Sequence, residues 1–285
     1  MARADLHIHS NASDGRYSPA EIVRMAANTG LAVMALTDHD TVDGLIPALA
    51  AGTDFPALTV IPGVELSTDT DSGEVHILGY FVDYGDREFK TSLDRMRNSR
   101  ENRAEKMVVK LNDLGCSVQM DRVKEIAGKG AIGRAHVAQV LLEKGYVGSF
   151  KEAFTKYIGH DCPAYVGREK LTPNEAVKLI IKAGGLPVMA HPFTSTHPEI
   201  VIRDLKQVGL VGMEVYYAGY FQAEIEVLLK MAQKYDLVPT GGTDYHGIDP
   251  NSEINIGGTD VPMQNVEKLI SLAEQRGQKT FLRLK

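Results

Sequence analysis

Short apolar runs alternate with amphipathic stretches along this chain, and this alternation constrains the fold more than any other feature of the sequence. Buried strands separated by helical segments are typical of βα units around a parallel sheet. The predicted strands are residues 4–8, 31–36, 58–61, 75–81, 186–190, 212–216 and 237–240. We therefore expect an α/β protein, and the 285 residues suffice for one β/α barrel with an insertion.

Residues 86–166 interrupt the alternation, because their pattern is helical throughout and contains no convincing apolar strand. We interpret them as an inserted helical subdomain that caps the substrate, with residues 1–85 and 167–285 forming the barrel. Two helix starts outside the insertion carry a capping box with proline at the first helical position, Ser-Pro-Ala-Glu at 18–21 and Thr-Pro-Asn-Glu at 172–175.

Composition narrows the classes of function. The 31 basic and 37 acidic residues give a net charge of −6, which argues against a broad binding surface for duplex nucleic acid. Met1 leads into Asp5 without a signal-like apolar segment, and no apolar run approaches the ~18 residues of a membrane helix. We predict a cytoplasmic protein without membrane contact, in which Cys116 and Cys162 are ordinary thiols.

Histidines and acidic residues gather where the predicted strands end. His7 and His9 are two residues apart, so a strand would place both on one face. The other groups close to predicted strand ends are Asp14, His39, Glu65, His191, Asp244 and His246. The C-terminal strand ends of a β/α barrel form its active-site face, so these side chains should converge. A single histidine is more often structural than a ligand, but the joint pattern favours a metal site.

A mixture of imidazole and carboxylate ligands without thiolate suits Mn²⁺, Fe²⁺ or Zn²⁺ better than Mg²⁺ or Ca²⁺. The set is larger than one ion needs, so we expect a cluster in which a carboxylate such as that of Glu65 bridges two ions. Two ions about 3.5–4 Å apart can share a hydroxide and clamp the attacking and leaving oxygens of a phosphoryl group. The residues therefore predict metal-dependent hydrolysis of phosphate esters.

Two basic segments in the insertion point to an anionic substrate. Residues 128–134 have the form Gly-x-Gly-x-x-Gly followed by Arg134, but no strand precedes them, so a dinucleotide fingerprint is excluded. They form either an anion-binding helix start, with Arg134 as a bidentate clamp, or a plain connecting loop. Arg97, Arg100 and Arg103 share a helical face, which either is solvated or binds further phosphates.

Five motifs, in order along the chain, resemble those of the PHP (polymerase and histidinol phosphatase) family of metal-dependent phosphoesterases. The motifs are Asp-Leu-His-Ile-His-Ser at 5–10, Thr-Asp-His-Asp at 37–40, Gly-Val-Glu at 63–65, Ala-His-Pro at 190–192 and Thr-Asp-Tyr-His at 243–246. The resemblance implies a distorted, seven-stranded TIM-like β/α barrel with a trinuclear metal site. Among members, the chain looks most like the small stand-alone enzymes with a helical insertion.

The resemblance also implies roles for individual residues. One ion would be held by His7, His9, Glu65 and Asp244. A second would be held by Glu65, His76 and His191, and a third by Asp14, His39 and His246. Arg134 and His136 match an Arg-x-His segment that contacts phosphate. Independently of the resemblance, the shared helical face offers Arg100 and Arg103 as further phosphate ligands. Among these groups, Glu65, His191 and Asp244 are the expected catalytic residues.

Residues beside the motifs have predicted supporting roles. Asp38 and Asp40 flank His39 and are expected to orient an imidazole through its other ring nitrogen. The glycine pair at 241–242 would allow close backbone approach to the cluster. His160 and His197 match no motif and are assigned surface or structural roles.

The resulting hypothesis is in-line attack by a metal-bridging hydroxide on a small phosphorylated substrate, with two to three divalent cations and Mn²⁺ favoured. The resemblance favours the 3′-phosphate of nucleoside 3′,5′-bisphosphates, short oligonucleotides, or both. The leaving oxygen would be stabilised by a metal or protonated by Asp244 or a histidine. Alternatives are a histidinol-phosphate phosphatase, an amidohydrolase acting on a C–N bond, and a non-catalytic metal module that accompanies a polymerase.

Overall fold

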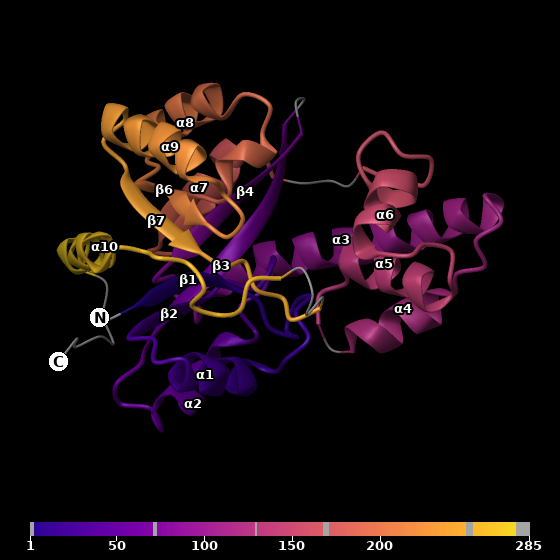
Figure 1. Ribbon diagram of the computed structural model, residues 1–285, viewed down its shortest axis with the longest axis horizontal. Helices are drawn as coiled ribbons and strands as arrows, with labels where there is room; N and C mark the ends of the chain where they lie inside the picture. Colours follow the sequence, from indigo (N-terminus) through magenta and orange to yellow (C-terminus); the bar gives the residue numbers. More distant parts are fainter. Residues whose placement is uncertain (1–2, 71–72, 129, 168–170, 249–252, 278–285) are drawn as a thin grey trace.

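The computed structural model describes residues 3–70, 73–128, 130–167, 171–248 and 253–277, and its centre is one seven-stranded sheet curled into a nearly closed barrel (Figure 1). The strands, in sheet order, are β1 (Ala4–Ile8), β2 (Val33–Leu36), β3 (Thr59–Thr70), β4 (Gly73–Tyr80), β5 (Leu186–Met189), β6 (Gly212–Tyr217) and β7 (Val238–Gly242). Backbone hydrogen bonds join β1 to the segment after β7: Asp244 N–H donates to His7 O (2.8 Å) and His9 N–H to Tyr245 O (2.9 Å). The predicted α/β barrel is confirmed.

The expectation of a parallel sheet is wrong for one strand, because β4 runs antiparallel to both β3 and β5. Thr70 ends β3 and Gly73 begins β4, which leaves no room for a crossover helix between them. The expected end of the third strand, at residue 61, is also wrong. β3 pairs with β2 up to Pro62 and with β4 from Gly63 onward, so Glu65 lies inside a long strand.

Within the described ranges, six α-helices surround the barrel: α1 (Pro19–Asn28), α2 (Leu45–Gly52), α7 (Pro173–Lys182), α8 (Pro198–Gln207), α9 (Gln222–Lys234) and α10 (Met263–Gln275). Both predicted capping boxes are present: the side chains of Ser18 and Thr172 accept from the backbone N–H of Glu21 and Glu175. Alternate residues of β2 face opposite ways: Met34 belongs to a core beneath α1 and α2, whereas Val33 belongs to a core that α10 covers. The helices thus bury both faces of the sheet.

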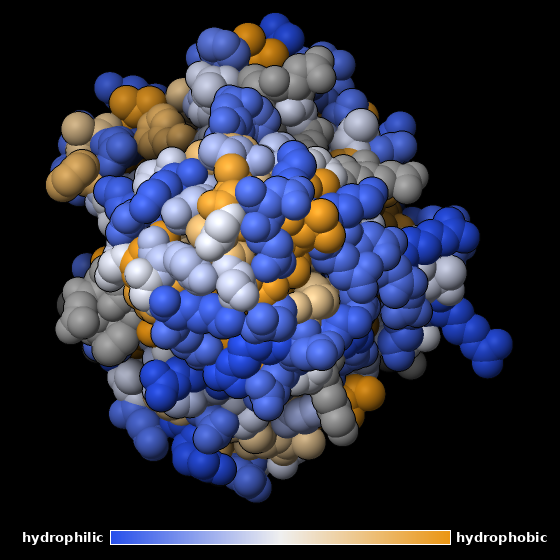
Figure 2. Space-filling model, turned by 90° about the vertical axis from the view of Figure 1, so that its right-hand side faces the viewer, coloured by the Kyte–Doolittle hydropathy of each residue, from blue (hydrophilic) through white to orange (hydrophobic). Residues whose placement is uncertain are grey.

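Residues 86–166 form helices that lie to one side of the barrel (Figure 1). These are α3 (Arg87–Asp113), α4 (Met120–Ala127), α5 (Arg134–Glu143), α6 (Phe150–Ala153) and a π-helical turn (Phe154–Ile158), and the described part of this stretch contains no strand. The second half of α3 joins α4 and α5 around a hydrophobic core of their own, whereas Phe89 and Leu93 in its first half pack into the barrel core. The outer face of these helices is mostly hydrophilic (Figure 2).

None of the helices in the described ranges combines the length and apolar character that crossing a bilayer requires.

We propose that residues 86–166 behave as a separate cooperative unit, and Leu141 tests this. Its side chain is fully buried in the helical core, so Leu141→Ala should cost about 2–5 kcal/mol of stability. Amide hydrogen exchange should quicken in α4 and α5 while β1–β3 stay protected. In the matched variant Leu78→Ala, in the core of the barrel, amide exchange should quicken in β1–β3 while α4 and α5 stay protected. Equal loss of protection throughout the chain in both variants would contradict a separate unit.

Candidate metal centre

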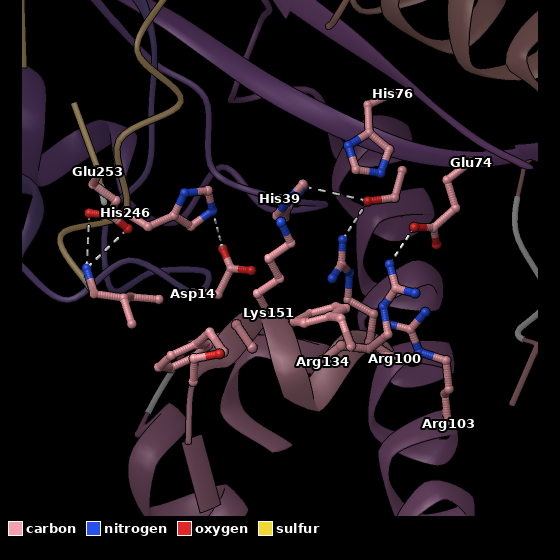
Figure 3. A pocket seen from close by; sticks show the side chains of 16 residues that line it. Asp14, His39, Glu74, His76, Arg100, Arg103, Arg134, Lys151, His246 and Glu253 are labelled. Atoms are coloured by element: carbon pink, nitrogen blue, oxygen red, sulfur yellow. Dashed lines mark hydrogen bonds and ion pairs between the residues drawn. The ribbon is translucent and has the colours of Figure 1, made fainter. Parts of the chain in front are cut away.

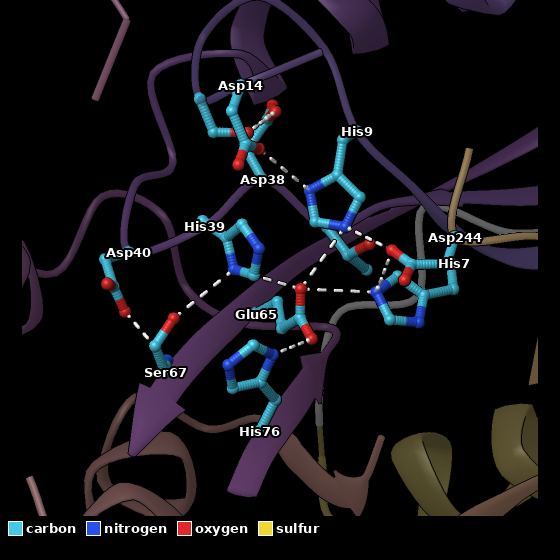
Figure 4. Close-up of polar contacts among 12 residues, drawn as sticks. His7, His9, Asp14, Asp38, His39, Asp40, Glu65, Ser67, His76 and Asp244 are labelled. Carbon is cyan, nitrogen blue, oxygen red and sulfur yellow. Dashed lines mark hydrogen bonds and ion pairs between the residues drawn. The ribbon is translucent and has the colours of Figure 1, made fainter. Parts of the chain in front are cut away.

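All nine predicted metal ligands meet at one end of the barrel, and Figure 4 shows those other than His191 and His246. They come from β1 and the segments after it, from the loop after β2, from β3 and β4, and from the segments after β5 and β7. The residues are His7, His9, Asp14, His39, Glu65, His76, His191, Asp244 and His246. Because β4 is antiparallel, His76 reaches the group from within a strand rather than from its C-terminal end.

The fully buried carboxylate of Glu65 lies at the middle of the group. Its Oε2 is 3.3 Å from His7 Nε2, 3.2 Å from His9 Nε2 and 3.0 Å from His39 Nδ1. Its Oε1 is 2.8 Å from His76 Nδ1 and 3.1 Å from His191 Nε2. Each carboxylate oxygen therefore faces a different set of imidazoles, which is the arrangement required of a bridging ligand.

Three sets of ligand atoms lie within 4.8 Å of one another. They belong to His7, His9, Glu65 and Asp244; to His39, Glu65 and His76; and to His9, Asp14, His39 and His246. The first set equals the one implied by the resemblance. The second contains His39 in place of His191, and the third adds His9, so His9 and His39 each stand between two sets.

The buried polar atoms of this group fit divalent cations. His7 Nε2, both ring nitrogens of His9, Asp14 Oδ1 and Glu65 Oε2 are buried and make no hydrogen bond within the described ranges. Leaving such atoms unsatisfied is costly, and here they point toward one another, as they would around bound ions. The combination of imidazole nitrogen and carboxylate oxygen suits Mn²⁺, Fe²⁺ or Zn²⁺.

Charges within the group are complementary. Burial lowers the pKa of His7, but the carboxylates of Glu214, Asp244 and Glu65 outweigh it and raise that pKa well above its usual value. Burial likewise opposes the charge of His246, and Asp14 overrides it, raising the pKa to about 10. Cation binding would therefore release protons from these rings.

Glu214 is a supporting residue that the sequence analysis missed. It is fully buried in β6, and its Oε1 lies 3.0 Å from His7 Nδ1 while its Oε2 accepts from the backbone N–H of His191 (2.7 Å). These contacts turn His7 Nε2 toward Glu65. The available signal was an acidic residue inside an otherwise apolar predicted strand.

The supporting role predicted for Asp38 and Asp40 stays a prediction, and their printed hydrogen bonds go to backbone, hydroxyl and guanidinium donors. Asp38 Oδ1 accepts from Ser10 N–H and Ser13 O–H (both 2.7 Å), and so holds the loop that carries Asp14. Asp40 accepts from Arg100 Nε at 2.6 Å. Backbone and guanidinium donors are closer to these acids than any ring nitrogen.

Gly242 and Gly130 both allow close approach to segments that carry predicted metal ligands. A Cβ on Gly242 would lie 2.5 Å from His7 Cβ, so this glycine lets β7 pack against β1, the strand that carries His7. A Cβ on Gly130 would lie 2.6 Å from Ser13 O and 2.7 Å from Asn11 O. The glycine-rich segment thus packs against the loop of Asp14.

A cavity of about 570 Å³ adjoins the metal centre (Figure 3). Asp14, His39, His76 and His246 line one side, and Arg100, Arg103, Arg134 and Lys151 line the other. We call it the arginine cavity. Three of the four predicted phosphate ligands therefore face one space beside the centre.

Two arginines of the cavity, Arg100 and Arg134, bind acidic residues of the barrel. Arg100 Nε binds Asp40, whereas Arg134 forms an ion pair with Glu74 and lies over the Phe154 ring, with 5.4 Å from guanidinium carbon to ring centroid. Arg97, from the same predicted stripe, pairs instead with Asp43 at 2.9 Å and lies outside the cavity.

The fourth predicted phosphate ligand, His136, lines a neighbouring cavity. Its Nδ1 accepts from Gly133 N–H (2.9 Å), which leaves Nε2 as the donor when the ring is neutral. Burial lowers the pKa of this ring, so the neutral form is favoured. His160 forms an exposed ion pair with Asp161, and His197 precedes α8, both apart from the metal centre.

Comparisons with known proteins agree with this geometry. Residues 5–158 match the PHP domain family. A 5′-3′ exoribonuclease of Haemophilus influenzae is 35% identical over 246 residues, 85% of this chain and 89% of the relative. A 3′,5′-nucleoside bisphosphate phosphatase of Chromobacterium violaceum is 32% identical over 251 residues, 86% of this chain and 88% of the relative.

Solved structures resemble the whole chain. A Chromobacterium violaceum protein described as an amidohydrolase, with bound sulfate and no metal, has a TM-score of 0.87 and 31% identity, covering 96% of this chain and 97% of that one. A Bifidobacterium adolescentis protein described as a metal-dependent phosphoesterase has a TM-score of 0.86 and 26% identity, covering 95% and 96%.

Glu214→Gln tests whether this residue orients the ligands. Glutamine keeps the size but offers one acceptor oxygen in place of two, so either His7 or the His191 N–H loses its partner. We expect Mn²⁺ affinity to fall about 10- to 100-fold, measured by calorimetry on chelator-stripped protein. Glu199→Gln, on the exposed surface of α8, is the matched control. Unchanged Mn²⁺ affinity in Glu214→Gln would show that Glu214 does not orient the metal ligands.

Proposed function

This chain belongs to the PHP domain family and is a phosphoric ester hydrolase, and from this premise we propose that it removes the 3′-phosphate of nucleoside 3′,5′-bisphosphates and cleaves short oligonucleotides. We further propose that it uses two to three divalent cations, with Mn²⁺ preferred to Fe²⁺ or Zn²⁺. The ligands would be those gathered around Glu65.

The observation that carries the proposal is the position of the arginine cavity. Four cationic side chains face the metal centre across one space, more than a single phosphate needs. A substrate with two phosphates would place one at the cluster and the other on Arg134 and Arg103.

The chain's own residues would position the reacting groups. Cations bound at the centre would supply Lewis acidity, which activates water and offsets charge on the phosphoryl oxygens. Glu65 would hold the cluster together, and Tyr217 donates to Asp244 Oδ2 (2.9 Å), which fixes that carboxylate. Phe154 and Glu74 hold Arg134 on two sides, so its guanidinium is oriented before substrate binds.

The alternative functions fit the cavity less well. A neutral amide would make no use of the positive charge of the arginine cavity, which disfavours an amidohydrolase despite the description of one solved relative. A non-catalytic module would not need the complete ligand set around Glu65. Histidinol phosphate carries one phosphate, so it would use only part of the arginine cavity.

Substitution of Arg134 tests the assignment of the second phosphate. In Mn²⁺-loaded protein, Arg134→Ala should lower kcat/KM for a 3′,5′-bisphosphate about 100-fold and affect a 3′-monophosphate much less. Phosphate release from both substrates is the measurement, with a chelator-treated sample to show metal dependence. Arg203→Ala, at an exposed arginine of α8 outside the arginine cavity, should leave both rates unchanged. Equal losses on the two substrates would contradict the assignment.

Substitution of Glu65 tests the cluster itself. Glu65→Gln removes the charge between the imidazoles, so turnover should fall on the order of a thousandfold or more. Metal content by mass spectrometry should fall in parallel. The control is Glu199→Gln. Near-normal activity of Glu65→Gln would exclude a bridging role for Glu65.

A further inference from the structure

A second cavity, of about 740 Å³, adjoins the metal centre beside Asp14. Asp14, Ala135, Phe150 and Ile248 line both this cavity and the arginine cavity. The two cavities therefore border each other at Asp14, and a molecule that occupied both would pass the metal centre. A nucleoside bisphosphate of the proposed function needs only one of them.

The lining of the second cavity suits a nucleotide rather than an isolated anion. Arg16, His136 and Gln139 supply polar groups, while Ile126 and Leu142 supply apolar surface. Small-molecule sites of about 300–1,000 Å³ are commonly built from such apolar walls with a few polar groups.

The acidic charge at the edge of the second cavity is compensated. Glu143 also lines it, but both of its carboxylate oxygens bind Arg122, at 3.0 and 3.1 Å. Arg16 thus faces no uncompensated charge from Glu143, and a phosphate beside Arg16 is not repelled from that side.

We propose that the second cavity binds the downstream nucleotide of an oligonucleotide, attached through its O5′ to the phosphate under attack. The inference rests on the proposed function and specifies how one site would accept both substrate classes. The upstream nucleoside, with its 5′-phosphate, would occupy the arginine cavity. The downstream part would continue past Asp14 toward Arg16 and Gln139.

One bond change accounts for both substrates. Water attacks phosphorus, the P–O3′ bond breaks, and the leaving O3′ takes a proton. From a bisphosphate the products are inorganic phosphate and a nucleoside 5′-phosphate. From an oligonucleotide the phosphate stays on O5′ of the shortened chain. That chain then has the same 5′-phosphate end that the arginine cavity binds, so cleavage would proceed from 5′ to 3′.

The test narrows the second cavity and compares two substrates in Mn²⁺-loaded, full-length protein. Gln139→Trp places a large ring in the cavity from a residue outside the helical hydrophobic core, and Arg16→Ala removes its exposed cation. Controls are Val109→Trp, on the exposed face of α3, and Arg24→Ala, on the exposed face of α1. The substrates are a nucleoside 3′,5′-bisphosphate and a 5′-phosphorylated RNA trinucleotide.

We expect Gln139→Trp to lower kcat/KM for the trinucleotide about tenfold or more, mainly through KM, and to change bisphosphate turnover less than about twofold. Arg16→Ala should weaken trinucleotide binding and reduce its dependence on salt. Unchanged trinucleotide kinetics in both variants, or equal losses on both substrates, would overturn the inference.

The unaltered protein separates this inference from the proposed function. Turnover of the bisphosphate without any cleavage of the trinucleotide would overturn the second cavity's role and leave the phosphatase intact. Turnover of neither substrate by metal-loaded protein would refute the proposed function, and the inference with it.

Discussion

A carboxylate buried among five imidazoles is the constraint on which the rest of this structure depends. Glu65 has no exposed surface, and its charge is balanced by rings on four other strands or the segments after them. Burial alone would raise its pKa, but the surrounding histidines lower the pKa well below its usual value, so the carboxylate stays ionised. The barrel is the architecture that brings so many strand ends around one point.

Much of this site could be predicted from sequence because its chemistry is local. His7 and His9 share a face through the two-residue period of a strand, and His39 and His191 directly follow apolar runs. What could not be predicted depends on contacts across the sheet. β4 is antiparallel because a tight connection joins it to β3. β3 continues past Pro62 because it changes its pairing partner from β2 to β4 there. The hydrophobic pattern of the sequence shows neither feature. Glu214 contacts a residue 207 positions away, which no local pattern reveals.

The helical insertion and the barrel are joined by ion pairs at the walls of the arginine cavity. Arg100 on α3 binds Asp40 after β2, and Arg134 on α5 binds Glu74 on β4. The Arg100–Asp40 pair is buried, and removing one partner of such a pair typically costs about 3–5 kcal/mol. Helical spacing alone therefore does not predict which of Arg97, Arg100 and Arg103 line the cavity. Arg97 pairs with Asp43 and lies outside it, whereas Arg100 and Arg103 line it.

The same ion pairs affect what the cavity can bind. Arg134 already has a carboxylate partner in Glu74, so an anion that contacts this guanidinium competes with an acid of the protein itself. A weakly charged ligand gains little from that exchange, because it replaces one charge-assisted hydrogen bond with another. A phosphate dianion brings more charge and more acceptor oxygens than a carboxylate, and a second phosphate at the metal centre holds it in place. The selectivity that we propose for doubly phosphorylated ligands would thus depend on the acids of the cavity as much as on its arginines.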